Sequence, residues 1–329
     1  MKINTKEILI TAWVLVFSDM FVYAQHQNDS IRQEVKGYVA RNFSEIRTFN
    51  LAWMTQPSHS YSIKNHGNNI TKGTLCSYSN IKLDVNVPIM RTKSLMVYAM
   101  GEAYFDNYHI GNVKSEPTML SQQENENKQY YSGGLNVIYN NIFWEKPFIL
   151  NSNISLDGYN HGLQQVLLSV TALSILHRSN TTNISAGLTF MWPFYKIPVL
   201  PIITYWHSFS PRWSIDVTMP KQFYFRYQPT SNNRLSLGTS LDMDQYYFCP
   251  DNKNLPFTCY YLSVSLNTEF IYEYLASQNL YFYIKGGLAK SVSGGIYKTN
   301  RKDIEGQHLK FTDSWKPFFS LGFSYNLFH

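Results

Sequence analysis

In several segments of this chain the charged residues keep to alternate positions, and apolar residues occupy most of the positions between them. From Arg234 to Asp244, for example, Arg, Ser and Asp alternate with Leu and Met. Charges that share one face can either pair with one another or line a water-filled passage that selects ions. We keep both roles open and take Arg226 beside Asp216 and Asp244 as the first pairing to examine. The residues that the alternation assigns to the polar face are Lys82, Asp84, Glu102, Asp106, Asp216, Arg226, Arg234, Asp242, Asp244, Glu269, Glu273 and Lys285.

A hydrolytic site is the competing chemistry. Enzymes embedded in bacterial outer membranes use Ser with His, and the sequence offers His207 next to Ser208, with His177 expected near the same end of the fold. None of these residues lies in a GxSxG setting. The nine histidines form no HxH or HxxxH pair that would predict a metal site. We therefore expect no enzymatic activity, no metal and no other cofactor.

The three cysteines match no metal-binding spacing. Cys249 and Cys259 bracket the turn-rich segment PDNKNLPFT. In an exported protein such a pair can close a disulfide across one loop, so this pairing is a candidate. Cys76 is interpreted as a small buried thiol.

The elements that must position the charged residues are β-strands, because apolar residues recur with period two from about residue 46 onward. A soluble sandwich would bury the apolar row of each strand, whereas a membrane barrel turns it toward lipid and encloses the polar row. In the segment 258–274 the barrel interpretation assigns Leu262, Val264, Leu266 and Phe270 to lipid, and Ser263, Ser265, Asn267, Glu269 and Glu273 to the interior.

Strand and loop lengths favour the barrel. Several expected strands exceed the ~9–11 residues that cross a bilayer at a tilt. The connections alternate between long and short, with one lapse at Pro220, as in a barrel with tight turns on one rim and longer loops on the other. We predict an all-β fold, namely an antiparallel up-and-down transmembrane β-barrel of 12 to 14 strands in one domain, residues 46–329. The expected strands are 46–56, 73–88, 94–107, 129–142, 148–157, 166–177, 182–191, 198–207, 212–219, 222–228, 234–247, 258–274, 279–293 and 315–328.

The N-terminus predicts export. Lys2 and Lys6 precede an apolar run over 8–17, which is shorter than the ~20 residues of a membrane-spanning helix. We expect a signal peptide over residues 1–24, a periplasmic segment over 25–45, and an integral position in the outer membrane of a Gram-negative bacterium. Charged residues make up only 15% of the chain, and the net charge of +6 is spread along it. Without a basic run, a nucleic-acid partner is not expected.

The central block, residues 210–247, and the aromatic-rich end WKPFFSLGFSYNLFH carry a family resemblance. The recurring elements of the block are Trp213, Pro220, Arg226, Tyr227 and the pair Leu235 and Leu237. The chain resembles outer-membrane β-barrel proteins of the Bacteroides group and, more narrowly, the uncharacterised family DUF6268. It departs from the usual barrel ending because His329 follows the terminal aromatic. The resemblance implies a barrel surrounded by outer-membrane lipid and lipopolysaccharide and inserted by the barrel-assembly machinery, and it implies no activity.

Three functions follow from these observations. The first, which we expect, is a pore or transporter for small solutes, or for apolar ligands that enter through the wall. The second is a structural or adhesive barrel with a plugged lumen, which would use the loops 57–72, 108–128 and 294–314 as contact surfaces. The third is a lipid-modifying enzyme of the outer membrane.

Overall fold

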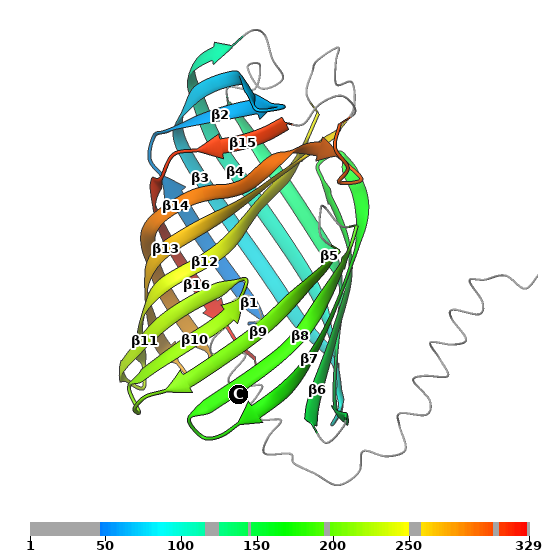
Figure 1. Cartoon of the computed structure of the whole chain (residues 1–329), viewed down its shortest axis with the longest axis vertical. Helices are drawn as coiled ribbons and strands as arrows, with labels where there is room; N and C mark the ends of the chain where they lie inside the picture. Colours follow the sequence, from blue (N-terminus) through cyan, green and yellow to red (C-terminus); the bar gives the residue numbers. More distant parts are fainter. Residues whose placement is uncertain are drawn as a thin grey trace, which may run out of the picture.

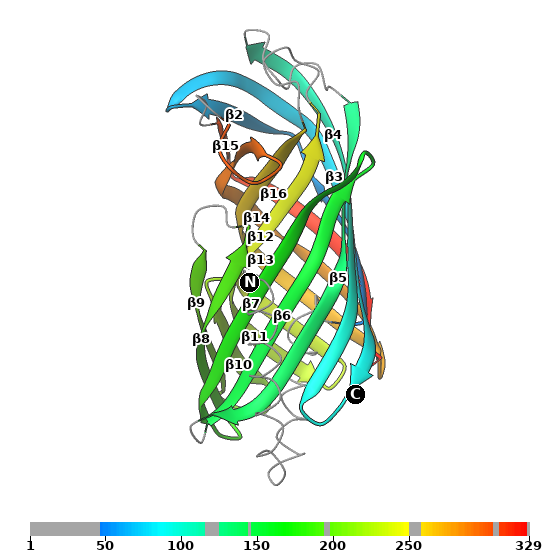
Figure 2. The same cartoon turned by 90° about the vertical axis from the view of Figure 1, so that its right-hand side faces the viewer.

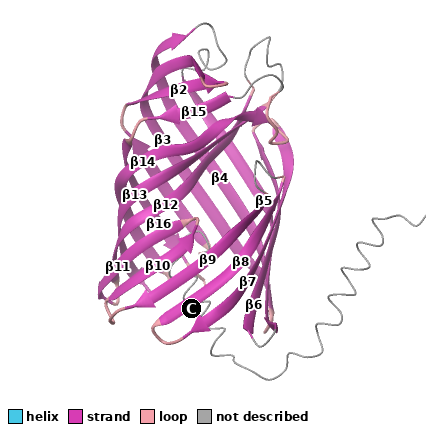
Figure 3. Cartoon of the chain, in the orientation of Figure 1, coloured by secondary structure: helices cyan, strands magenta, loops and turns pink. Residues whose placement is uncertain are grey.

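A computed structural model describes residues 47–115, 125–143, 146–193, 198–249, 258–304 and 309–327. Within them, sixteen β-strands form one antiparallel sheet (Figures 1 and 3), and no helix is long and apolar enough to cross a membrane. The predicted signal peptide and periplasmic segment lie outside the described residues. The strands are β1 (Phe49–Gln56), β2 (His59–Asn65), β3 (Asn68–Arg91), β4 (Leu95–Ser115), β5 (Asn125–Phe143), β6 (Lys146–Tyr159), β7 (Gly162–Arg178), β8 (Thr182–Trp192), β9 (Val199–Ser208), β10 (Trp213–Met219), β11 (Gln222–Thr230), β12 (Asn233–Phe248), β13 (Cys259–Ser277), β14 (Leu280–Lys298), β15 (Leu309–Asp313) and β16 (Lys316–Tyr325).

The sheet closes on itself at the first and last strands. β1 pairs with both β3 and β16, and β16 also pairs with β14. β2 and β15 pair with each other and continue β1 and β16 toward one rim. The result is a closed antiparallel barrel of 14 strands, which confirms the predicted fold. We call the end where β1 begins and β16 finishes the terminal end, and the opposite one the loop end.

Every predicted strand is present, but β2 and β15 were not predicted. Both lie in segments that the sequence analysis assigned to loops, 57–72 and 294–314. The reason is local: Pro57 and Ser58 interrupt the alternation after β1, and β15 has only five residues, too few to show a clear alternation. Much of these two expected contact loops is therefore paired β-structure at the loop end (Figure 1).

Side chains divide between the two faces of the wall as in a membrane barrel. Large apolar side chains are exposed on the outer face, for example Ile203 at 53%. On the inner face of the same region, Asp216 and Ser236 are buried. Because every barrel strand is paired with a neighbour on both sides along at least part of its length, most backbone polar groups are satisfied within the wall. An apolar exterior around a polar interior is the arrangement that lipid requires.

The wall is uneven in height. β8 to β11 have 7 to 11 residues, whereas β3, β4 and β5 have 19 to 24 (Figures 1 and 2). β12 pairs with β11 only as far as Ser240, and its remaining residues lie above the short wall. There Tyr247 of β12 donates a hydrogen bond to Asp157 of β6 at 2.9 Å. The tall strands therefore close over part of the lumen at the loop end.

This closure changes the surroundings of the apolar side chains of β13 that the sequence analysis assigned to lipid. Phe270 is 49% exposed on the outer face, as predicted. Leu262, however, is buried in a cluster with Tyr130, Tyr159 and Tyr247. The prediction that Leu262 faces lipid is wrong, because the tips of β12 to β14 pack against β5 and β6 at the loop end.

Candidate functional site

The first group of charged side chains surrounds Glu273 toward the terminal end. The Glu273 carboxylate accepts hydrogen bonds from Arg47 at 3.2 Å and from Arg234 at 2.5 Å. Arg226 lies 4.0 Å from the same carboxylate and donates to Asp216 at 2.8 Å. The predicted pairing of Arg226 with Asp216 is therefore present. Apart from the half-buried Arg234, these side chains are buried, so each charge depends on its partners.

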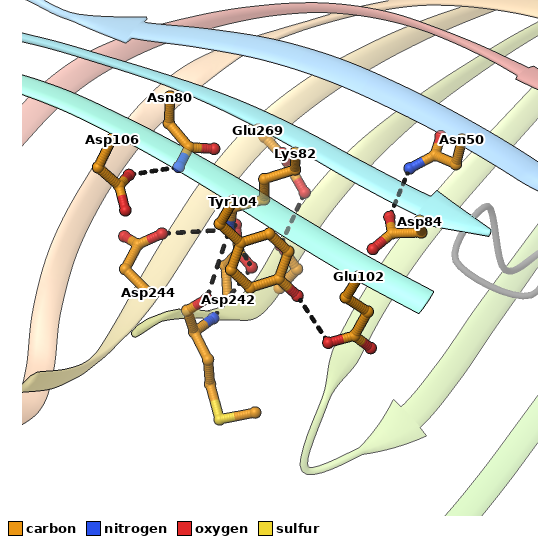
Figure 4. A network of polar contacts seen from close by, with 12 residues as sticks. Asn50, Asn80, Lys82, Asp84, Glu102, Tyr104, Asp106, Asp242, Asp244 and Glu269 are labelled. Atoms are coloured by element: carbon orange, nitrogen blue, oxygen red, sulfur yellow. Dashed lines mark hydrogen bonds and ion pairs between the residues drawn. The ribbon is translucent and has the colours of Figure 1, made fainter. Parts of the chain in front are cut away.

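The second group spans the lumen between β3 and β12 (Figure 4). Lys82 Nζ lies 3.4 Å from an oxygen of Asp242 and 3.1 Å from an oxygen of Asp244. Asp244 thus pairs with Lys82, and the expectation that it lies with Arg226 is wrong. The cause is tertiary, because strands far apart in the sequence face each other across a narrow lumen at this level.

The other predicted lumen residues also have partners on the inner face. Glu269 accepts hydrogen bonds from Tyr224 and from Ser240, the latter at 2.7 Å, which joins β11, β12 and β13. Asn50 donates to Asp84 at 2.9 Å, Tyr104 donates to Glu102 at 3.3 Å, and Asn80 donates to Asp106 (Figure 4). Lys285 Nζ lies over the Tyr283 ring, 5.3 Å from its centroid.

A polar cavity of about 140 Å³ lies among these groups. Its charged lining residues are Lys82, Asp84, Lys221, Arg226, Arg234, Asp242, Glu269, Glu273 and Lys285. Eight of the predicted lumen residues therefore border one space. Of the others, Asp216 is fully buried and paired with Arg226, Asp244 borders a different cavity, and Glu102 and Asp106 line neither.

A second cavity, of about 90 Å³, lies toward the loop end and is lined mainly by apolar and aromatic side chains. The Lys82 ion pairs lie between the two cavities, because Lys82 and Asp242 line the polar one and Asp244 lines the apolar one. The sequence analysis missed this cavity. Its signal was the alternation of Tyr61 and Ile63 in a segment read as a loop.

A third polar group closes the loop end, and the sequence analysis missed it too. Asp157 of β6 is fully buried and accepts hydrogen bonds from Tyr247 at 2.9 Å and Tyr130 at 3.2 Å. Arg301, which follows β14, donates to the same carboxylate at 3.3 Å. Because these partners come from distant segments, no local pattern in the sequence could have assembled them.

The residues considered for hydrolysis are engaged elsewhere. His207 Nδ1 lies 2.8 Å from the Thr182 hydroxyl, while Ser208 donates to the Ser210 carbonyl at 2.8 Å. As neighbours in β9, His207 and Ser208 point to opposite faces of the sheet. His177 is exposed at the end of β7. In the part of the chain that the structure describes, no group of three or more His, Cys, Asp or Glu is placed to hold a metal ion.

Cys249 and Cys259 lie at the adjoining ends of β12 and β13, where Phe248 pairs with Cys259. In the structure both are thiols, Cys249 exposed and Cys259 buried. The disulfide between them stays a prediction. Cys76, which the sequence analysis interpreted as a buried thiol, is only half-buried.

Fold and interior together define the class of protein: an outer-membrane-type β-barrel with 14 antiparallel strands and an ion-paired interior. The chain belongs to the family DUF6268, a domain of unknown function, whose family model matches residues 144–326, more than half of the sequence. This confirms the resemblance to that family. No curated protein matches the sequence.

Several solved outer-membrane barrels are similar in structure. The COG4313 outer membrane channel from Pseudomonas putida F1 has 8% identity and a TM-score of 0.38, over 84% of this chain and 95% of that one. The outer membrane protease OmpT from Escherichia coli has 9% identity and a TM-score of 0.30, over 84% and 96%. A FadL homologue of Pseudomonas aeruginosa has 9% identity and a TM-score of 0.29, over 87% and 92%. At these values the similarities carry no argument about activity.

Proposed function

We propose that this barrel is a narrow pathway for small polar solutes across the outer membrane of a Gram-negative bacterium, held closed by the Lys82 ion pairs. The observation that carries the proposal is the order of features inside the barrel. A polar, charged cavity lies on one side of the Lys82 ion pairs, which join β3 to β12, and a second, mainly apolar cavity lies on the other. We propose no catalytic role.

The composition of the polar cavity supports transport of polar solutes. Its walls bring together charges of both signs from β3, from β11 to β14 and from the turn at Lys221, and such a lining is stable only when it is hydrated or paired. Five cations and four anions line the cavity. Because the two signs nearly balance, we expect weak selectivity between small cations and small anions.

The Lys82 ion pairs have the properties of a removable barrier. Lys82 is the cation that lies between Asp242 and Asp244, and Asp106 is close by on β4 (Figure 4). Without the ammonium group, the carboxylates would repel one another and attract water. Removal of the Lys82 ammonium group should therefore widen and hydrate the lumen, and it should favour the passage of cations over anions.

Conductance in planar lipid bilayers tests the proposal. We expect small or infrequent currents from the purified wild-type barrel, and larger, cation-preferring currents from Lys82→Ala. The matched control is Lys290→Ala, which removes an exposed cation that lies over the Trp315 ring and should leave the currents unchanged. Heat-modifiable gel migration checks that each variant is folded. A folded Lys82→Ala barrel with wild-type currents would refute the gating role.

A filled structural barrel is the second candidate, and a specific observation favours it. The tips of β12 to β14 pack over part of the lumen, and Asp157 is fully buried among Tyr130, Tyr247 and Arg301. In this case neither the wild type nor Lys82→Ala would conduct, and liposomes containing either barrel would take up no small sugar or amino acid. That pair of results would replace the pathway with a structural role.

A further inference from the structure

The apolar cavity at the loop end is a pocket in the interior of the barrel, enclosed by side chains of several strands. Aromatic and aliphatic side chains dominate its lining, among them Ile63, Leu75, Tyr246 and Ile296. Its volume of about 90 Å³ is several times the ~10–15 Å³ that one water molecule requires. Apolar cavities tend to stay dry and to accept apolar molecules, so the pocket can hold more than isolated water.

Two buried polar atoms in this pocket have no partner among the described residues. They are His59 Nε2 and the Tyr61 hydroxyl, and the two side chains are only 7% and 6% exposed. His59 and Tyr61 lie two residues apart on the same face of β2. Buried polar atoms in native proteins nearly always have a hydrogen-bond partner. A ligand would supply the two that are missing.

The contacts of these side chains define the chemistry of the ligand. His59 Nδ1 lies 3.0 Å from the Pro57 carbonyl oxygen, which can only accept, so Nδ1 carries the proton and Nε2 of the neutral ring is an acceptor. The ligand group must therefore donate to Nε2. A carboxylate does not fit, because Lys316, the cation that lines the pocket, is already paired with Asp313 at 2.6 Å.

Tyr61 is held in place for such a contact. Its ring lies over Gly73 of β3, where an added Cβ would come within 2.7 Å of the Tyr61 hydroxyl. On its other neighbour, β15, Phe311 stacks with Tyr61 at 5.8 Å between ring centroids. Gly73 is needed because any side chain there would displace the ring. The hydroxyl group is thus presented to the pocket by a fixed scaffold.

The wall beside the pocket has a short gap in the backbone pairing of β1/β2 with β15/β16, which we call the seam; it ends at the hydrogen bond from the Ser314 N–H to the Ser60 carbonyl at 3.3 Å. The β1–β16 ladder ends at Thr55 and Phe319, and the β2–β15 ladder resumes in the same register at Tyr61 and Asp313. Continuing this register places Pro57 opposite Pro317, and neither residue has an N–H to donate. The pocket lining includes Gln56, His59 and Lys316 from the two sides of this seam.

The outer surface of the seam carries side chains typical of a membrane boundary. Trp315 and Phe319, which flank Pro317 on its two sides along the chain, are exposed, the former at 50%, and Trp53, four residues before Pro57 in β1, is exposed too. Tryptophan is enriched where lipid meets water, because its ring is apolar and its N–H is polar. A molecule dissolved in this region of the membrane therefore meets the seam directly.

We propose that the apolar cavity binds an apolar molecule with one hydroxyl group, which enters from the membrane through the seam between β1/β2 and β15/β16. The ligand hydroxyl donates to His59 Nε2 and accepts from the Tyr61 hydroxyl, while its apolar body occupies the space lined by Leu75 and Ile296. Binding at this site does not require that solutes pass through the barrel, so this proposal and the proposed pathway can be tested independently.

Binding of three probes to the barrel in lipid nanodiscs tests this site: 1-naphthol, naphthalene and 1-naphthoate, each compared with empty nanodiscs. We expect protein-dependent binding in the order naphthol, naphthalene, naphthoate. His59→Phe and Tyr61→Phe should each weaken naphthol binding about two- to tenfold, the usual effect of one lost hydrogen bond, and leave naphthalene binding unchanged. Leu75→Trp should fill the pocket and abolish both. The control Ile203→Phe, on the outer face of β9, should change neither.

Several results would overturn the proposal. One is binding no greater than in empty nanodiscs for all three probes. Another is equal affinity for naphthol and naphthalene, which would mean that water satisfies His59 and Tyr61. Unchanged naphthol affinity in folded His59→Phe and Tyr61→Phe barrels would also remove the assigned contacts. Conductance of the same samples reports separately on the pathway, so the failure of one proposal is distinguishable from failure of the other.

Discussion

The Glu273 cluster offers the sharpest test of how the barrel interior is held together. Glu273 lies among three arginines, and Arg47 joins it to the last strand by also donating to Ser324 of β16 at 2.6 Å. The substitution Glu273→Gln keeps the shape of the side chain and removes its charge. It leaves three buried or half-buried guanidinium groups with Asp216 as the carboxylate still paired in the cluster.

The expected loss can be worked from the distances. At an effective dielectric constant of ~20, contacts of 2.5, 3.2 and 4.0 Å each correspond to roughly 4–7 kcal/mol of direct attraction. The cost of removing the charges from water opposes most of this attraction. Once Glu273 is neutral, that cost remains for the arginines without compensation. Removing one partner of a buried pair typically destabilises by ~3–5 kcal/mol, and we expect a loss in this range.

Urea unfolding of the barrel in lipid vesicles measures the loss, with heat-modifiable migration as an independent check. The double variant Glu273→Gln/Arg234→Gln should recover part of the stability, because it restores the balance of charge. Lys290→Gln, a charge change on an exposed side chain, should alter the free energy of unfolding by less than ~0.5 kcal/mol. Glu273→Gln with wild-type stability would show that lumen water, not the ion pairs, satisfies these arginines.

Two further predictions concern the wall. Ile203→Lys should destabilise the barrel by ~2–4 kcal/mol, the cost of a lysine that faces the centre of the bilayer. Thr204→Lys, on the inner face, should change the free energy of unfolding little in the same assay. Equal effects would contradict the assignment of the two faces. Gly238→Ala should cost ~1–3 kcal/mol, because a Cβ there would lie 2.0 Å from the Phe223 carbonyl oxygen. Gly101→Ala, whose nearest contact is 3.9 Å, is the control and should be nearly neutral, and a neutral Gly238→Ala would refute the close approach of β11 and β12.

Local pattern was sufficient for the architecture. Alternation of apolar and polar residues located each of the 14 barrel strands, because the side chains of a strand alternate strictly between its two faces. It also assigned the charged residues to the interior, and eight of those predicted line one polar cavity. The pairing of Arg226 with Asp216 was predictable as well, since adjacent hairpin strands bring them together.

Contacts across the barrel were decided by tertiary structure alone. Lys82 meets Asp242 and Asp244 because the lumen is narrow where β3 faces β12, and the lengths and tilts of many strands together set that width. The burial of Leu262 has the same origin. Its position in the alternation is that of a lipid-facing residue, and the low wall of β8 to β11 lets the tip of its strand fold inward.

The apolar pocket shows most clearly what the sequence alone could not predict. Neither Pro57 nor Pro317 can donate a ladder hydrogen bond, which is evident from the sequence. The sequence analysis read Pro57 as the start of a loop and placed Pro317 inside the last strand. Only the closed register of the first and last strands places the two prolines opposite each other, with β2 and β15 paired above them. The sequence by itself determined a polar-lined barrel. The closure of the barrel determined where ion pairs cross the interior and where the interior is apolar. Those contacts join residues that are far apart in the sequence, and the alternation within a strand does not relate them.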